Sequence, residues 1–191
     1  MKRALKAVLH AIFLALAFPM ALLCLFGRAE AVFRFFAQLC ALGPGYPGDY
    51  LRMAFYKMTL QSCDLEGRIQ FGSFFAHPQA QMGRRVYIGS YCILGRVSLG
   101  ERTQIASGVQ ILSGRRQHPR DAEGRLLGSD AGAFDPISIG PDCWIGAGAI
   151  VMADIGANST VGSGSVVVHP VPAASVAVGS PARVVAASGE A

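Results

Sequence analysis

Histidine is the residue type in this sequence best suited to proton transfer, and the chain contains four histidines. His10 lies in an apolar N-terminal segment, His77 lies near the start of a repetitive region, and His169 lies close to the C-terminus. His118 lies in a polar segment, residues 113–136, which interrupts the repeat once. An imidazole titrates near neutral pH and can therefore accept a proton from a nucleophile. Most isolated loop histidines are solvated surface residues, so the surroundings of His118 decide whether it does chemistry.

Charged side chains cluster around His118 in the same loop. The four arginines of this cluster are Arg115, Arg116, Arg120 and Arg125. They form either a solvated charged surface or a site for an anionic substrate or for cofactor phosphates. A histidine that acts as a base also needs an acceptor that orients its second ring nitrogen. Asp121, Asp135 or a backbone carbonyl is suited to that role, and the sequence does not choose among them.

The five cysteines argue against a disulfide framework or a cysteine metal site. They are Cys24, Cys40, Cys63, Cys92 and Cys143. Their number is odd, their spacing is irregular, and none forms a CxxC pair. We therefore expect reduced, small apolar residues of the kind found in cytosolic proteins.

A six-residue apolar repeat predicts the elements that position the histidine loop. Its apolar positions are Ile93, Leu99, Ile105, Ile111, Ile139, Ile145, Val151, Ile155, Val161 and Val167. A glycine follows several of them, and the residue four places on is usually small or β-branched, as in Thr103 and Ala149. In a β-helix each hexad is one short strand and one corner, and three hexads close a triangular coil of about 18 residues. We expect the apolar residues to face inward, the small residues to lie where the next coil packs, and the glycines to relax the corners.

The phase of the repeat is ambiguous in its first part. Ile93 and Leu94 offer alternative registers for the same coil, and the polar Gln81 occupies an expected apolar position. The sequence therefore predicts a mainly β domain over residues 69–186, with a protruding loop over residues 113–136.

Several motifs beyond the hexads resemble the hexapeptide-repeat acyltransferases. They are Gly108-Val-Gln-Ile111, the His118-Pro119 pair, Cys143-Trp-Ile-Gly-Ala-Gly148 and Val178-Gly-Ser-Pro-Ala-Arg-Val184. The similarity is to the maltose, galactoside, serine and polysaccharide O-acetyltransferases. It implies a left-handed parallel β-helix, which is an exception to the right-handed crossover rule. It also implies a homotrimer with active sites between subunits.

The resemblance further implies transfer of an acetyl group from acetyl-CoA to a hydroxyl group, without a metal. His118 matches the family's catalytic histidine and would act as the general base, although the segment before it is longer than in the sugar acetyltransferases. The implied substrate-binding residues are Arg115, Arg116, Gln117 and Asp121. The implied cofactor-binding residues are Trp144, Gly146, Ala147, Gly148, Ser163, Gly164, Ser180 and Arg183. We expect Trp144 to lie on an outer corner of a coil. A simple packing role for its side chain is as well supported as cofactor binding.

Other functions remain open for a β-helix of this kind. A zinc carbonic anhydrase needs three converging histidines, and His118 has no histidine near it in the sequence. An acyltransferase of lipid or lipid-linked sugar that uses an acyl carrier protein suits the apolar N-terminus, and a catalytically silent scaffold is the non-enzyme alternative. The resemblance favours sugar acetylation in exopolysaccharide or surface-glycan biosynthesis, with serine as another possible acceptor.

Residues 1–42 are expected to form an apolar helical extension that associates with a membrane. No formally charged residue occurs from Ala7 to Phe26, and a helix of that length matches the hydrocarbon core of a bilayer. The alternatives are a cleaved signal peptide, a single spanning helix, a re-entrant or interfacial hairpin, and helices that pack on the protein itself. A cytosolic acyl donor favours the hairpin, on the cytoplasmic side of the inner membrane. Residues 43–68 are expected to hold a turn and a short amphipathic helix over residues 51–60.

The distribution of charge supports a membrane rather than a nucleic acid as partner. The net charge is +5, and residues 1–68 carry eight Lys and Arg against four Asp and Glu. Residues 69–191 are nearly balanced, with nine against eight. A basic N-terminal extension suits an anionic membrane surface. The folded body shows no basic stripe with interleaved aromatic residues, so we expect no nucleic-acid binding.

Overall fold

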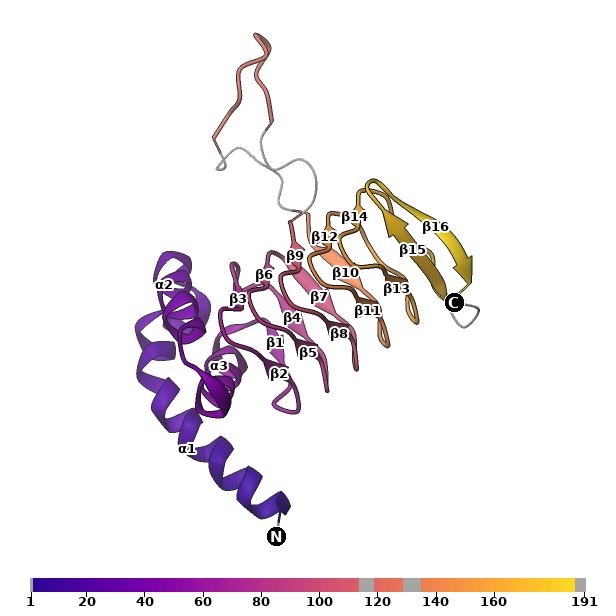
Figure 1. The fold of residues 1–191 in the computed structure, drawn as a ribbon. Coiled ribbons are helices and arrows are strands. Elements are labelled where there is room, and N and C mark those ends of the chain that lie inside the picture. The colour runs from indigo at the N-terminus through magenta and orange to yellow at the C-terminus, as the bar shows by residue number, and fades with distance from the viewer. Residues whose placement is uncertain (1, 114–118, 129–134, 188–191) are drawn as a thin grey trace.

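The chain folds into a three-sided parallel β-helix whose N-terminal end is covered by helices. The computed structural model describes residues 2–113, 119–128 and 135–187. Short strands follow one another around the three faces, and each strand pairs in parallel with the equivalent strand of the next coil. Figure 1 shows the coils stacked between the helices at one end and a β-hairpin at the other. The expected mainly β fold with a helical N-terminal region is confirmed.

The strands form three sheets, and each sheet is one side of the β-helix, called face A, B or C below. Face A contains β1 (Ser62–Cys63), β4 (Gln81–Met82), β7 (Val97–Leu99) and β10 (Ile137–Ile139). Face B contains β2 (Arg68–Ile69), β5 (Tyr87–Ile88), β8 (Gln104–Ile105), β11 (Trp144–Ile145), β13 (Thr160–Val161), β15 (Ser175–Gly179) and β16 (Ala182–Ala187). Face C contains β3 (Phe74–Phe75), β6 (Ile93–Leu94), β9 (Gln110–Ile111), β12 (Ile150–Val151) and β14 (Val166–Val167). All pairs are parallel except β15 with β16, which is antiparallel.

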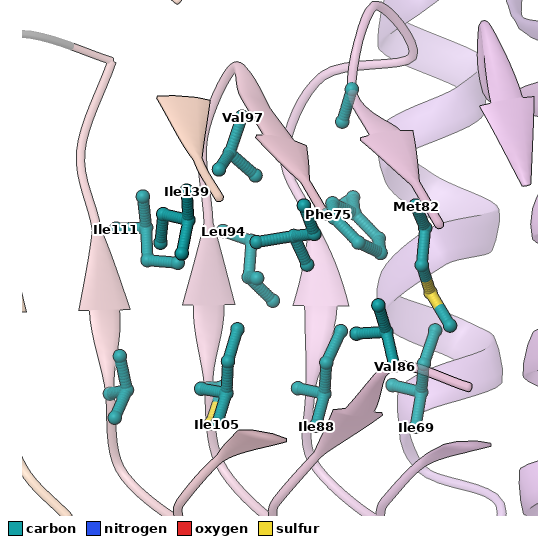
Figure 2. Packing of buried hydrophobic residues seen from close by; sticks show 14 of the residues in the cluster. Ile69, Phe75, Met82, Val86, Ile88, Leu94, Val97, Ile105, Ile111 and Ile139 are labelled. Carbon is teal, nitrogen blue, oxygen red and sulfur yellow. The ribbon is translucent and has the colours of Figure 1, made fainter. Parts of the chain in front are cut away.

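One apolar residue from nearly every strand points into the prism and forms a continuous core. Figure 2 shows Ile69, Ile88 and Ile105 stacked on one face, with Phe75, Leu94 and Ile111 opposite them. These residues are essentially inaccessible to solvent. Burial of such a column, together with the backbone bonds between coils, is the main source of stability in a solenoid.

The structure resolves the ambiguous phase of the first coils. Leu94 is buried whereas Ile93 is 42% exposed, so the expected inward position of Ile93 is wrong. Leu94 faces inward because it stacks on its equivalents in the coils on either side, and a shortened corner then leads to Leu99. Met82, not Gln81, faces inward on β4. The first coil begins with β1, before the expected start at residue 69, and Cys63 is its inward residue.

The small residues lie where successive coils pack, as expected. Thr103, Ala149 and Ser159 are buried, and the Thr103 hydroxyl donates to the Gly140 carbonyl of the next coil at 2.8 Å. Cys143 occupies an equivalent position, and its thiol lies 3.1 Å from the Gly156 carbonyl. All five cysteines are free and buried. The prediction of small, reduced cysteines is thus consistent with where these side chains pack.

The glycines that follow inward residues have a different role from the one expected. At Gly146 and Gly156 a Cβ atom would lie 2.4 Å and 2.3 Å from a backbone nitrogen of the next coil. Glycine is required there because the coils approach too closely for a side chain, whereas a left-handed backbone is adopted at other corner residues such as Asp142 and Asn158.

The N-terminal helices are α1 (Lys2–Leu23), η1 (Leu25–Gly27), α2 (Glu30–Ala41) and α3 (Gly45–Thr59). Helix α3 starts earlier than the expected 51–60, because Pro47 lies in its first turn, where the missing N–H has no helical partner to lose. Helix α3 packs on α1, α2, β1 and β2. Its buried residues therefore lie on more than the single expected face, and Met53, Phe55 and Tyr56 are all inaccessible.

Side chains of α3 supply hydrogen-bond partners to the first strand of each face. Lys57 Nζ donates to the Cys63 carbonyl at 2.9 Å, and Arg52 Nε donates to the Ile69 carbonyl at 2.9 Å. On face C the Phe75 amide donates to the Tyr56 hydroxyl at 3.1 Å. Strands β1, β2 and β3 are the edges of their sheets, and an unpaired edge favours aggregation. Helix α3 thus caps all three edges at once.

Candidate functional site

The predicted cofactor-binding glycines stack along one edge of the prism, between faces B and C. This edge, named here the B/C edge, contains residues 146–149, 162–165 and 178–181 of successive coils. The Gly164 amide donates to the Ala147 carbonyl at 2.8 Å, and the Gly179 amide donates to the Ser165 hydroxyl at 3.1 Å. Residues far apart in sequence therefore form one continuous strip.

Most backbone amides of this strip already have partners. Gly146 donates to the Val161 carbonyl at 2.8 Å, and Gly148 donates to the Ser107 carbonyl at 3.0 Å. The amides of Ala147 and Ser163 make no hydrogen bond within the described part of the chain. These two amides, one coil apart on the same edge, are therefore among the donors available to a bound carbonyl or amide group.

Trp144 lies beside this strip on the outer surface of face B. Its side chain is 56% exposed, and the residue pairs with Gln104 and Thr160 of the neighbouring coils. The expected corner position is wrong, because Ile145 faces inward and its strand neighbour must therefore face outward. An exposed tryptophan is not packing the core, so the simple packing alternative for Trp144 does not hold.

Ser180 and Arg183 belong to the C-terminal β-hairpin. Ser180 lies between β15 and β16, and Arg183 lies on β16 opposite Val178. Both residues are solvent-accessible, and the Arg183 guanidinium contacts only the carbonyl of its neighbour Ala182 within the described residues. The hairpin therefore places a serine hydroxyl and an exposed cation at the C-terminal end of the B/C edge.

The histidine loop leaves the prism from a different edge. Strand β9 on face C ends at Ile111 and β10 on face A begins at Ile137, so the loop starts at the edge between faces C and A. Its described residues 119–128 project away from the coils (Figure 1). The predicted residues Arg115, Arg116, Gln117 and His118 lie outside the described residues, and their roles stay predictions.

Asp121 organises the tip of the loop. Its carboxylate accepts hydrogen bonds from the amides of Glu123 and Arg125 at 3.1 and 2.8 Å, and from the Arg125 guanidinium at 2.8 Å. These bonds, led by the Arg125 amide, hold the pKa of the Asp121 carboxyl below its usual value. The Arg120 guanidinium donates to the Gly124 carbonyl at 2.6 Å. Both arginines described in this loop thus stabilise its conformation.

The first residue of the loop, Ser113, is buried and fixed on the β-helix. Its role was not predicted from the sequence. Ser113 is 3% exposed, and its hydroxyl accepts the amide of Arg96 at 2.8 Å. Ser113 follows Ile111 by two residues and not by four, so the hexad spacing gave no signal for it. The loop therefore starts from a fixed point on the β-helix.

The other histidines are held away from this loop or lie on the surface. The His10 ring packs on Tyr50 with ring centres 5.3 Å apart, and His77 Nδ1 lies 2.5 Å from a Glu30 carboxylate oxygen. His169 is exposed, between β14 and the bridge at Val171. Among the described residues, no group of three His, Cys, Asp or Glu side chains is arranged to hold a metal ion.

The fold and the strip of small residues define a hexapeptide-repeat protein, and comparisons with known proteins agree. The family profile described as "Hexapeptide repeat of succinyl-transferase" matches residues 126–153 and 136–169. Nodulation protein L of Rhizobium meliloti is 38% identical over 148 residues, 75% of this chain and 69% of the relative. Its namesake in Rhizobium leguminosarum bv. viciae is 48% identical over 111 residues, 56% of each chain.

More distant relatives are named for an enzyme activity. Serine acetyltransferase of Mycobacterium tuberculosis is 32% identical over 119 residues, 59% of this chain and 45% of the relative. A solved maltose O-acetyltransferase from Clostridium difficile superposes with a TM-score of 0.64 at 22% identity, covering 85% of this chain and 89% of that chain. The chain thus spans about half the length of several curated relatives. It belongs to the hexapeptide-repeat acyltransferase family.

Proposed function

We propose that this protein is an O-acetyltransferase that transfers acetyl from acetyl-CoA to a hydroxyl group of a sugar. The observation that carries the proposal is the B/C edge, where the free amides of Ala147 and Ser163 lie one coil apart near the exposed Trp144. A thin acyl-pantetheine arm offers carbonyl and amide groups at intervals, which suits such a row of donors. The serine acetyltransferase relative supports acetyl as the transferred group.

His118 is the proposed general base. It takes the proton of the acceptor hydroxyl as the hydroxyl oxygen attacks the thioester carbonyl. The carbon–sulfur bond then breaks, and the coenzyme A thiolate leaves and takes up the proton from the imidazolium. Attack is direct, in a complex of both substrates, so no acetyl-enzyme forms. Arg115, Arg116 and Gln117 are proposed to bind the acceptor.

The active site is proposed to form between the subunits of a homotrimer. Within one chain the histidine loop starts at the edge between faces C and A, whereas the open amides lie on the B/C edge. The described residues 119–128 of this loop also project away from the coils (Figure 1). A neighbouring copy is therefore the natural source of the loop that completes each groove, and mixing a His118→Ala chain with a groove-defective Trp144→Ala chain should restore activity in the hybrids.

Serine is the second candidate acceptor, favoured by the serine acetyltransferase relative. A sugar presents several hydroxyls on a bulky ring, whereas serine presents one hydroxyl beside an ammonium and a carboxylate. Incubation with acetyl-CoA and each acceptor, followed by mass spectrometry of the products, distinguishes the two. The cytosolic supply of acetyl-CoA leads us to propose a cytoplasmic location for the catalytic domain.

The proposal is tested by the replacement His118→Ala, with His169→Ala as its control. Loss of a general base lowers the rate by about 10²–10⁴-fold, while the exposed His169 should have no effect. An unchanged rate for His118→Ala would remove this residue from the mechanism. Absence of acetyl transfer to any hydroxyl acceptor by the wild-type chain would overturn the assignment itself.

A further inference from the structure

The outer side of α1 is apolar along nearly its whole length. Every exposed residue from Ala7 to Leu23 is apolar, including Ile12, Leu16 and Phe18, each about half exposed. A soluble helix normally carries polar residues on its solvent side, and one that is apolar all round lies in a core or a membrane. By length and composition the segment Ala4–Leu23 is able to cross a bilayer, but the same properties suit a helix that lies on the surface.

The inner side of α1 is fixed to the rest of the protein. Ala17, Ala21 and Cys24 are completely buried, and Phe13 stacks on Tyr50 of α3 with ring centres 5.5 Å apart. Helix α3 in turn caps the first coil of the β-helix. A spanning orientation would strip α1 from these contacts, whereas an orientation in the plane of the membrane preserves them.

Helix α2 extends the apolar surface beyond the end of α1. Val32, Phe35 and Leu39 are exposed on α2, and Phe26 of η1 is exposed between the two helices. Leu23, Val32 and Phe35 line an open apolar depression where α1 and α2 meet. Figure 1 shows both helices as the outermost elements at the N-terminal end of the coils. The exposed apolar residues of α1, η1 and α2 are called the apolar face below.

Basic residues border the apolar face on two sides. Lys6, Arg84 and Arg85 line one depression beside Ala7, where Glu66 is the acidic partner of both arginines. Lys6 and the two arginines outnumber Glu66, the one carboxylate that lines this depression, while Asp64 and Glu101 lie within electrostatic range of Arg84. Arg28 and Arg34 are exposed on the other side of the apolar face, where the Glu30 carboxylate lies 3.8 Å from the Arg34 guanidinium. Such a border is complementary to phosphate groups, and each Lys or Arg near an anionic bilayer adds about fivefold to binding.

We infer that the apolar face docks into the surface of an anionic phospholipid bilayer, with α1 and α2 in the plane of the membrane and the basic border among the headgroups. The charges favour this occupant over a second copy of the chain. In a two-fold contact between apolar faces, the cationic borders would meet cationic borders in either direction. The inference is independent of acetyl transfer and concerns only where the β-helix is held.

The test measures cosedimentation of the full-length protein with vesicles of phosphatidylcholine, with and without phosphatidylglycerol. Wild-type protein should bind the anionic vesicles about 25-fold more tightly than the neutral ones, or more. Arg84→Gln/Arg85→Gln should weaken that binding roughly 25-fold without changing binding to neutral vesicles. The control Arg120→Gln/Arg125→Gln removes two arginines from the histidine loop and should bind like the wild type.

The apolar contribution is tested with Leu16→Gln/Phe35→Gln. Both side chains are about 60% exposed, so the urea midpoint should match that of the wild type. Binding to both kinds of vesicle should fall about tenfold for each side chain replaced. Failure of the wild type to bind, equal binding to neutral and anionic vesicles, or unchanged binding by this variant would each overturn the inference. So would a fall in oligomer mass of this variant without lipid, measured by light scattering, because that would identify a second copy as the occupant.

Discussion

Replacement of Arg52 by methionine should destabilise the protein strongly, because this guanidinium joins α2, α3 and the β-helix in a site without solvent. Its side chain is completely inaccessible. Nε donates to the Ile69 carbonyl, Nη1 to the Gly43 carbonyl at 2.7 Å, and Nη2 to Asp49 at 2.7 Å. Nη1 also approaches the carbonyls of Cys40 and Ala41 at the end of α2. Positive charge is favourable at a helix C-terminus.

The cost follows from which acceptors lose their partners. The Cys40 and Ala41 carbonyls keep amide donors from Gly43 and Gly72, and Asp49 keeps its 2.6 Å bond with Arg68. The Ile69 and Gly43 carbonyls lose the only donors they have among the described residues. An unpaired buried carbonyl costs about 1–3 kcal/mol. Because the Gly43 carbonyl is only partly buried, the two together predict a loss of about 1–4 kcal/mol in the free energy of unfolding.

Urea unfolding followed by circular dichroism measures this loss, and hydrogen exchange locates it. Exchange should accelerate first in α2, α3 and β2, because these are the elements that Arg52 joins. Arg125→Met is the matched control, since that side chain is 75% exposed and its ion pair with Asp121 contributes little. A loss below about 0.5 kcal/mol for Arg52→Met, typical of surface substitutions, would refute the reasoning.

Three further predictions concern the core. Tyr56→Phe leaves a buried amide of β3 without its acceptor and should lower the free energy of unfolding by about 1–3 kcal/mol in urea titration; no change would mean that water replaces the hydroxyl. Gly156→Ala forces a Cβ against the next coil and should lower the free energy of unfolding by about 1–3 kcal/mol in urea titration. Gly128→Ala is the control, because open space surrounds Gly128, and it should leave the free energy of unfolding unchanged. Burial raises the pKa of the Cys40 and Cys63 thiols to about 12, so mass spectrometry should find them unmodified by iodoacetamide at pH 8 until the chain is unfolded, and rapid labelling of the native protein would contradict this.

The fold could be predicted from sequence because the hexad pattern is local and repeated. Inward residues such as Ile105 and Ile145 follow from spacing alone. Ile93 and Leu94 could not be separated this way, since both are apolar and adjacent. The choice between them depends on Phe75 and Ile111, which lie one coil away on each side.

The candidate site could be predicted only as a set of residues. The sequence pointed to Gly146, Ala147, Gly148, Ser163 and Gly164 without distinguishing them, because each offers the same backbone amide. Stacking of the coils consumes three of these amides in bonds between neighbouring coils and leaves two open. Which amides stay free is a property of register between coils, and no single segment contains that information.

By itself the sequence determined the β-helix, the place where the histidine loop interrupts it and the apolar character of the N-terminal helices, because each is written in local composition and spacing. Only the tertiary structure decided that Arg52, Tyr56 and Lys57 of one helix cap three sheets. The strands that these side chains contact come close to one another only when the first coil forms. It also decided that α1 is fixed on one side and open on the other. That arrangement exists only once α3 has packed between α1 and the coils.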